Sequence, residues 1–500
     1  MRPFEARRAG VLLHPTSLPG PHGSGDLGSE AHAFIDWLAD AGQSYWQMLP
    51  VVPPAGGHSP YQSSSAFAGD PGLVALADLP GLPSTPAPRL PVDRVDFAAT
   101  AAFRSEVRRR SFEQARGADG LEPFLAYCAR EAAWLEDYAL YAALKQEHGG
   151  AAWTAFPTPL RDREPRALSA ARERLMPSIR AHQYDQYLFD TQWAALRAHA
   201  RERGVSLIGD LPIFVGHDSA DVWQHRQLFQ LDADGEPTVV AGVPPDYFSE
   251  DGQRWGNALY DWAAHERDGF AWWRARFRSI LARFDAVRVD HFIGFHRTWA
   301  IPRAAATARA GRYEPSPGAA LFDAVISALG PLPVIAEDLG VVTPEVTALR
   351  QRYGFPGMQV LEFSFNPGVD ARDTLPHACG VDTVVYTGTH DNDTVEGWLA
   401  DLHRRAARDD AAREQLDYVR AYLDRARPTA WDLVRLAHAS HARSAIVPLQ
   451  DLLGQGAEAR MNTPGTTDGN WSYRALPGQI DAALGARLRS LTSTFARTPA

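Results

Sequence analysis

The stretch Ala286–Phe292 reads AVRVDHF, and it combines the pattern of a buried strand with two charges. Val287 and Val289 alternate, as the apolar face of a strand should. The opposite face carries Arg288 and Asp290. Burying a charged group is costly unless it is paired. The stretch therefore predicts a strand whose polar face borders a site that uses a cation and a carboxylate together.

Further short apolar runs resemble strands, and helical patterns lie between them. In Ser29–Gly42, for example, Phe34, Trp37 and Leu38 share one face of a predicted helix. Strands that alternate with helices favour a parallel sheet, and eight such units can close into a barrel. The sequence thus predicts an α/β fold, a (β/α)8 TIM barrel with inserted, mostly helical subdomains. The candidate strands are Gly10–Leu13, Ser44–Val51, Val205–Phe214, Asp285–Asp290, Pro333–Asp338, Gly357–Phe363, Asp382–Gly388 and Ser444–Gln450.

The spacing of the candidate strands is uneven and predicts two insertions. A Pro-rich entry and polar helical patterns fill the gap between strands two and three. The gap between strands three and four holds DADG, Asp232–Gly235, which resembles half a calcium loop but lacks the Glu at its twelfth position, so a hairpin turn is favoured. The predicted parts are 1–70 (strands one and two with a polar loop), 71–193 (helical insertion), 194–215 (strand three), 216–284 (insertion with a mobile loop) and 285–500 (strands four to eight).

Composition limits the classes of partner. A hydrophobic content of 45% and 14 Trp support a large packed core, and a net charge of −10 argues against nucleic acid or an anionic membrane as the main partner. No apolar run is long enough to cross a membrane, and the N-terminus lacks the features of a signal peptide. Cys128 and Cys379 lie far apart, with no spacing typical of a zinc site or a disulfide framework. We therefore expect a cytoplasmic protein.

Acidic residues occur at the ends of several candidate strands. Asp210 lies late in strand three, Asp290 ends strand four, Glu337 lies at the end of strand five, and Asp391 follows strand seven. Each alone has an ordinary explanation, because Asp commonly caps the helix after a strand. Catalytic groups in a barrel of this kind come from the carboxyl ends of different strands. Four acids at such ends, with Arg288 in register, favour an active site.

The surroundings of two of these acids predict different protonation states. Arg288 favours the ionised form of Asp290, as a nucleophile requires. Glu337 follows an apolar strand, and desolvation would raise its pKa toward that of a working acid. Such a pair is typical of a retaining glycosidase, in which the two carboxyl groups lie about 5 Å apart. Asp391, with His390, would then bind sugar hydroxyls, whereas Asp338 points the other way and is interpreted as structural.

The loop after strand two, Gly56–Pro71, could contact a sugar. The ring of Tyr61 can stack on a pyranose, and Ser59 and Gln62 can form hydrogen bonds with hydroxyl groups. A polar loop rich in Gly and Ser is also the commonest kind of surface loop, and this alternative stays open. For His14, which follows strand one, a structural hydrogen bond is favoured over a role in the site.

A second loop, Pro244–Asn257, could cover the site. Tandem Pro stiffens its entry, and its aromatic side chains could restrict the access of water. The alternative is a surface loop that packs on the barrel. The side chains of interest in this loop are Asp246, Tyr247, Phe248 and Trp255.

With these residues identified, the sequence resembles the 4-α-glucanotransferases called amylomaltases or disproportionating enzymes, glycoside hydrolase family 77. The resemblance covers nearly the whole chain, and the motifs together, in this order, are highly specific. They are LLHPTSLPGPHGSGDLG, SPYQSSSAFAGDP, IGDLPIFV, AGVPPDYFSEDGQRWGN, VRVDHFIGF, IAEDLG, YTGTHDNDT and PLQDLLGQGAEARMNTPGTTDGNW.

The resemblance implies a role for each matching residue. It implies catalysis by Asp290 as nucleophile, Glu337 as general acid/base and Asp391 as the carboxylate that stabilises the transition state. It also implies malto-oligosaccharides and α-1,4-glucans as donor and acceptor, and no metal or organic cofactor. We expect a monomer or weak homodimer. Substrate binding is expected of Ser59, Tyr61, Asp210, Asp246, Tyr247, Phe248, Trp255, Arg288 and His390.

One departure from the family pattern is visible. The motif W-G-N-P-L-Y reads WGNALY here, with Ala258 in place of Pro. Losing that Pro would loosen the backbone beside the covering loop, because Pro restricts the chain. The departure bears on the rigidity of the loop and leaves the two carboxyl groups untouched.

Two other functions fit the same residues. A retaining α-glucan hydrolase of the α-amylase type would use the same acid and nucleophile, because its first half-reaction is identical. A glucan-binding module without activity would lack the carboxylates, and all of them are present. The sequence therefore favours a transferase, with the hydrolase as the alternative.

Overall fold

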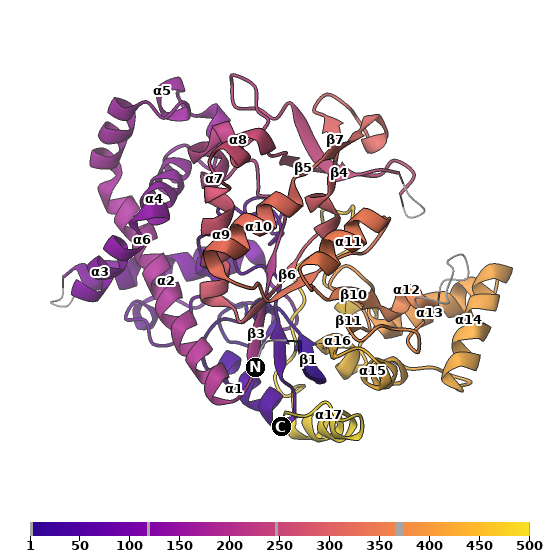
Figure 1. Ribbon diagram of the computed structural model, residues 1–500. Coiled ribbons are helices and arrows are strands. Elements are labelled where there is room, and N and C mark those ends of the chain that lie inside the picture. Colours follow the sequence, from indigo (N-terminus) through magenta and orange to yellow (C-terminus); the bar gives the residue numbers. More distant parts are fainter. Residues whose placement is uncertain (1–3, 118–120, 246–248, 366–374, 500) are drawn as a thin grey trace.

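The computed structural model describes residues 4–117, 121–245, 249–365 and 375–499. Within these ranges, eight parallel strands form one sheet at the centre of the molecule (Figure 1). Each strand overlaps one of the predicted runs. The strands are β1 (Arg8–Leu12), β2 (Tyr45–Gln47), β3 (Ser206–Leu211), β6 (Ala286–Val289), β9 (Val334–Ala336), β10 (Gly357–Val360), β11 (Thr383–Tyr386) and β12 (Ser444–Pro448).

The sheet curls into a nearly closed barrel. Its strand order is β10-β11-β12-β1-β2-β3-β6-β9, so β1 pairs with β12 from the far end of the sequence. Between the two outer strands, the N–H of Ala336 in β9 donates to the carbonyl of Pro356, just before β10, at 2.9 Å. The predicted (β/α)8 barrel is confirmed.

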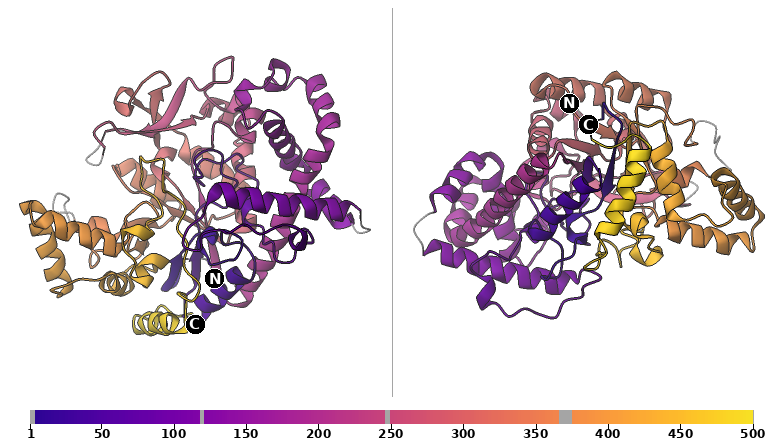
Figure 2. Two further views of the ribbon diagram at one scale, coloured as in Figure 1. Left: turned by 180° about the vertical axis from the view of Figure 1, so that it is seen from behind. Right: turned by 90° about the horizontal axis from the view of Figure 1, so that it is seen from below.

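Helices follow most of the barrel strands in the chain and surround the sheet (Figures 1 and 2). Gly209 of β3 allows one close contact between these layers, because a Cβ there would lie 2.4 Å from the ring of Phe284. The helices between and after the barrel strands include α1 (Ser29–Asp40), α9 (Ala271–Arg283), α10 (Gly318–Leu329), α11 (Pro344–Arg352), α12 (Leu361–Ser364), α13 (Val395–Ala406), α14 (Asp410–Leu423), α15 (Ala430–Ala439), α16 (Leu449–Leu453) and α17 (Ala482–Thr494).

The first insertion, between β2 and β3, is helical, as its sequence predicts. Its longest helix, α6, continues past residue 193 and ends at Glu202. The indole N–H of Trp193 donates to the carbonyl of Arg283 at the end of α9. One helix therefore serves both the insertion and the barrel wall. The helices of this part are α2 (Phe97–Arg116), α3 (Glu122–Arg130), α4 (Ala132–Glu147), α5 (Thr158–Arg161) and α6 (Pro165–Glu202).

The second insertion supplies part of an antiparallel sheet that the sequence does not predict. The sheet combines strands from before and after β6, in the order β5-β4-β7-β8. The outer strand β8 is short and polar, but the ring of its Tyr313 meets the ring of Trp299 on the neighbouring strand β7, with the ring centroids 4.8 Å apart. Its strands are β4 (Val239–Val243), β5 (Gln253–Ala258), β7 (Arg297–Pro302) and β8 (Arg312–Pro315). Two short helices, α7 (Ala220–Gln224) and α8 (Trp262–Arg267), precede β4 and follow β5 in the chain.

The predicted turn at Asp232–Gly235 is also present. The N–H of Asp232 donates to the carbonyl of Glu236 at 2.8 Å, and Leu231 forms an antiparallel bridge with Pro237. Gly235 has a φ of +86°, which favours glycine. The stretch DADG is therefore a hairpin turn.

The two ends of the chain meet at the amino-terminal end of the barrel strands (Figures 1 and 2). The fully buried guanidinium of Arg497 donates to the carbonyls of Arg8 and Arg443, which precede or begin β1 and β12. In the part of the chain that the structure describes, no helix is long and apolar enough to span a membrane.

Candidate active site

Arg288 lies between two carboxylates. It pairs in register with Asp210 of the neighbouring strand β3. Its Nη1 contacts Oδ2 of Asp210 at 2.6 Å, and its Nη2 contacts Oδ1 of Asp290 at 3.0 Å. The side chain of Asp210 is 1% exposed, whereas that of Asp290 is 26% exposed. The guanidinium of Arg288 is therefore shared by two carboxylates, and of the two Asp290 is the one that solvent or a substrate can reach.

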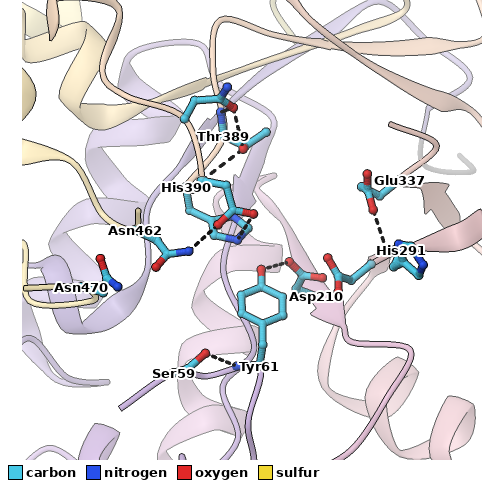
Figure 3. Close-up of polar contacts among 12 residues, drawn as sticks. Ser59, Tyr61, Asp210, His291, Glu337, Thr389, His390, Asn462 and Asn470 are labelled. Atoms are coloured by element: carbon cyan, nitrogen blue, oxygen red, sulfur yellow. Dashed lines mark hydrogen bonds and ion pairs between the residues drawn. The ribbon is translucent and has the colours of Figure 1, made fainter. Parts of the chain in front are cut away.

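Glu337 follows β9 and contacts the backbone next to Asp290. Its Oε2 accepts the N–H of His291 at 2.6 Å (Figure 3). Its Oε1 accepts the N–H of Leu339 at 3.1 Å. His291 has the left-handed φ of +49°, which is uncommon outside glycine. The turn after Asp290 thus directs a backbone donor to the second carboxyl group.

Burial sets the protonation of Glu337. Desolvation is the largest influence and raises the pKa of this carboxyl, and the charge of Asp290 raises it further. Arg288 and the two backbone N–H groups oppose the shift. The pKa of Glu337 therefore lies well above its usual range, in the direction that the sequence predicts for a working acid.

Tyr61 lies on the other side of Asp210. Its hydroxyl donates to Oδ2 of Asp210 at 2.7 Å, and its ring stacks on that of His390 at 5.0 Å and 11° (Figure 3). Its backbone N–H donates to Oγ of Ser59 at 3.3 Å. Burial raises the pKa of Asp210, and Arg288 opposes this shift. Tyr61 thus presents a fixed aromatic ring next to the buried acid.

Asp391 has a different set of partners. Its Oδ1 accepts Nδ2 of Asn462 at 2.6 Å, and its Oδ2 lies 3.4 Å from Nε2 of His390. The guanidinium of Arg460 donates to the backbone carbonyl of Asp391 at 2.6 Å. Burial lowers the pKa of His390, although Asp391 opposes the shift. Asp391 is therefore held in place by the 460–462 segment, as Figure 3 shows for Asn462.

The sequence alone does not reveal the partners that this late segment supplies to Asp391. Asn462 and Arg460 lie about 70 residues after Asp391, and Trp471 packs near the rings of Tyr61 and His390 at 5.9 Å. Their segment belongs to one of the motifs of the resemblance. However, it has no hydrophobic periodicity that would place its side chains. Asn470 lies on the same segment in Figure 3 and accepts the N–H of Thr463 at 2.9 Å.

Trp255 forms one wall beside the acid pair. It lies on β5, and its ring meets that of His291 edge-on at 5.0 Å and 89°. Gln62, which the sequence predicts to bind hydroxyl groups, donates instead to the backbone carbonyl of Trp255 at 3.1 Å. The predicted binding residues Asp246, Tyr247 and Phe248 lie outside the described residues.

Asp338 and His14 are two residues for which the sequence favours a structural role. Asp338 points away from Glu337, because it pairs with Arg350 at 2.9 Å and accepts the N–H of Met358 at 2.8 Å. His14 is buried, and burial lowers its pKa to about 3, so the ring is neutral. The contacts of Asp338 fit a structural side chain, whereas the role of His14, which His390 influences, stays a prediction.

The geometry brings the predicted acids to one end of the barrel. Asp210, Asp290 and Glu337 come from three neighbouring strands, β3, β6 and β9, and Tyr61 links Asp210 to the His390–Asp391 side. An accessible carboxylate with a cationic partner, beside a carboxyl with a raised pKa, can carry out nucleophilic attack and proton transfer at one bond.

Comparisons with known proteins identify the family. The family model described as 4-alpha-glucanotransferase matches residues 13–478. The 4-alpha-glucanotransferase of Thermus thermophilus is 48% identical over 500 residues, covering 98% of this chain and 99% of its own. The enzyme of the same name from Synechocystis is 44% identical over 506 residues, covering 99% of both chains.

Solved structures give the same result. The amylomaltase from Streptococcus agalactiae, in complex with acarbose, has a TM-score of 0.93 and 35% identity, covering 99% of this chain and 100% of its own. The fold of the amylomaltase from Corynebacterium glutamicum is also similar, with a TM-score of 0.79 at 21% identity, covering 98% of this chain and 75% of its own. With this extent of match and these carboxyl groups at the barrel end, the chain belongs to the 4-α-glucanotransferase family.

Proposed function

We propose that this enzyme transfers α-1,4-glucan segments between malto-oligosaccharides by a retaining double displacement. The observation that carries the proposal is the Asp290–His291–Glu337 arrangement. In it, the residue after an accessible carboxylate donates its N–H to a carboxyl group whose pKa is raised by burial. The peptide N–H of His291 thus places the proposed acid, Glu337, next to the proposed nucleophile, Asp290.

In the first half-reaction, the glucan donor binds across the barrel end. Asp290 attacks the anomeric carbon, while Glu337 gives its proton to the leaving glycosidic oxygen. The products are a covalent β-glycosyl–enzyme and a free glucan with a new 4-hydroxyl group. For this step we expect the two carboxyl groups to lie about 5 Å apart, the separation typical of retaining enzymes.

In the second half-reaction, the 4-hydroxyl group of an acceptor glucan attacks the intermediate. Glu337, now ionised, takes the proton of that hydroxyl group, and the bond to Asp290 breaks. Two inversions at the same carbon give net retention. The acceptor is a sugar rather than water because a bound sugar has a high effective concentration and a fixed orientation.

The other side chains would stabilise and orient the sugar. Asp391, fixed by Asn462, would face the positive charge that develops at the anomeric carbon. The ring of Tyr61 would stack on the donor sugar, with Asp210 and His390 as hydrogen-bonding groups beside it. Trp255 would line the acceptor side and restrict water.

Incubation with maltotriose tests the proposed function. A transferase produces glucose and a series of longer chains, and the number of reducing ends stays constant. A retaining α-glucan hydrolase would raise the number of reducing ends from the start. A glucan-binding module without activity would leave maltotriose unchanged. Chromatography of the products, together with a reducing-end assay on the same samples, distinguishes the three outcomes.

We also propose a cytoplasmic location for the enzyme. Cys128 and Cys379 are both free and buried, which fits a reducing cytoplasm. Relatives named 4-alpha-glucanotransferase occur in bacteria, and others from plants are named as chloroplastic or amyloplastic. We expect a monomer or weak homodimer, which sedimentation at several concentrations would test.

A further inference from the structure

Gln62 connects the loop that carries Tyr61 to the wall that carries Trp255. Its Nε2 donates to the backbone carbonyl of Trp255 at 3.1 Å and to Oδ1 of Asn257 at 3.0 Å. Asn257 is 4% exposed, and its Nδ2 donates to the carbonyl of Val215 at 2.8 Å. The Gln62 amide therefore supplies a donor to two acceptors on β5.

The position of Trp255 bears directly on the acid pair. Its ring lies edge-on against His291, and the N–H of His291 donates to Glu337. Its indole N–H is engaged by Gln253, two residues earlier on the same strand. In addition to the pairing of β5 with β4, the hydrogen bond from Gln62 thus ties the backbone of Trp255 to the loop that carries Tyr61.

We propose that Gln62 is a positioning residue that acts through Trp255 and governs the use of the acceptor. This inference rests on the proposed function, in which Trp255 lines the acceptor side. Gln62 does not bind sugar in this scheme, because its amide N–H group is directed to β5.

The division between donor and acceptor follows from the contacts of two neighbouring residues. Tyr61 directs its hydroxyl to Asp210 and its ring to His390, on the proposed donor side. Gln62 contacts Trp255 and Asn257, on the proposed acceptor side. Replacing Gln62 leaves the Trp255 carbonyl and Oδ1 of Asn257 without this donor. We expect β5 to shift so that these two acceptors find other donors. The contacts of Tyr61 with Asp210 and His390 do not involve the Gln62 amide.

The test compares Gln62→Met and Gln62→Glu with the wild-type enzyme. Both variants keep roughly the length of the side chain and lack its N–H donors. With maltotriose as donor and labelled glucose as acceptor, we expect the KM for glucose to rise about tenfold and the share of hydrolysis to increase. The total rate of donor cleavage should stay within about twofold. Ser64→Ala is the matched control, because it removes a hydrogen bond of the same loop, to Pro53, that does not reach β5.

A double-mutant cycle with Trp255→Ala decides whether Gln62 acts through Trp255. If it does, Gln62→Met causes no further rise of the KM for glucose in the Trp255→Ala background. An additive rise, or a fall in donor cleavage as large as the change in the KM for glucose, would overturn the proposal. Failure of the wild-type enzyme to transfer from maltotriose would instead refute the proposed function, so the two failures are distinguishable.

Discussion

The N–H of His291 donates to the Oε2 atom of Glu337 at 2.6 Å, and His291 is the residue that follows Asp290. The backbone N–H next to Asp290 therefore holds the carboxyl group of Glu337. The backbone of Asp290 is itself anchored, because its N–H donates to the carbonyl of Leu211 in β3 at 3.0 Å. Fixed geometry of this kind lowers the cost of reaching the transition state, since little must be reorganised during the reaction.

Replacing either carboxyl group of this pair should abolish transfer. For Asp290→Asn and Glu337→Gln we expect kcat to fall by roughly four orders of magnitude, because the residues act as a unit. Asp338→Asn is the control, since Asp338 lies next to Glu337 in sequence but pairs with Arg350. Its kcat should stay near that of the wild type. Rates with maltotriose measure all three, and an active Asp290→Asn variant would refute the assignment of the nucleophile.

The activity should be lost at alkaline pH. Glu337 can act as an acid only while it carries a proton, and burial raises its pKa well above its usual range. Hence kcat/KM for maltotriose should be retained through the weakly acidic range and fall as the pH rises through the pKa of the folded enzyme. A maltosyl fluoride donor needs no proton on its leaving group. With it, Glu337→Gln should form the intermediate without this alkaline limb. An alkaline limb that persists in this variant would contradict the role of Glu337.

Asn462 should matter for the rate because it holds Asp391. Its Nδ2 donates to Oδ1 of Asp391 at 2.6 Å. For Asn462→Ala we expect kcat to fall by about 10²-fold or more, as for the loss of other groups that orient transition-state charge. Asn470→Ala is the comparison. Asn470 anchors the same segment through its hydrogen bond with Thr463, and none of its hydrogen bonds within the described residues is to Asp391. Equal losses in the two variants would show that Asn462 acts only by ordering the segment.

Tyr61→Phe should distinguish the contribution of the Tyr61 hydroxyl group from that of its ring. The variant keeps the ring that stacks on His390 and removes the donor to Asp210. The free energy of unfolding should fall by about 1.5–3 kcal/mol, the range for a hydrogen bond to a charged group. The pKa of Asp210 should rise further, since the Tyr61 hydroxyl lowers it. Tyr418→Phe, on an exposed ring, serves as the control in denaturant unfolding. Equal stability losses in the two variants would contradict this contact.

The barrel could be predicted because each strand carries its own local signal. Short apolar runs such as Val334–Ala336 lie between helical patterns, and a parallel sheet is the arrangement that buries them on both faces. The acids at the ends of β3, β6 and β9 then follow from strand alternation alone. Arg288 and Asp290 share a face because they are two residues apart.

What the sequence did not predict depends on contacts between distant segments. Strand β8 (Arg312–Pro315) is short and polar, and it is a strand only because it pairs with β7. The partners of Asp391 come from a segment about 70 residues later, which has no periodic pattern. The Gln62 amide likewise takes its direction from its two acceptors on β5, which is distant from it in the sequence. A polar side chain in a loop can face a ligand or a strand, and only the fold decides between them.

Arg497 should contribute to the stability of the fold rather than to the chemistry of the site. Arg497 is fully buried where the two chain ends meet. Its guanidinium donates to carbonyls of Arg8, Arg443, His438 and Ala442 at 2.8–3.1 Å. The planar guanidinium of Arg directs its N–H groups to carbonyls on several sides. Lys carries its three donors on one nitrogen and cannot reach all of these carbonyls. Arg497→Lys should therefore leave buried acceptors unpaired and reduce the free energy of unfolding by roughly 3 kcal/mol.

The same substitution should leave catalysis intact in the fraction that remains folded. Arg8 and Arg443 lie at the amino-terminal end of the strands, whereas Asp290 and Glu337 lie at the carboxyl ends. Denaturant unfolding measures the stability, and kcat with maltotriose at low temperature measures the site. Arg487→Lys is the control, because Arg487 lies on α17, the helix that precedes Arg497 in the chain, and is exposed. A stability loss no larger than that of this control would show that the buried fork does not hold the chain ends together.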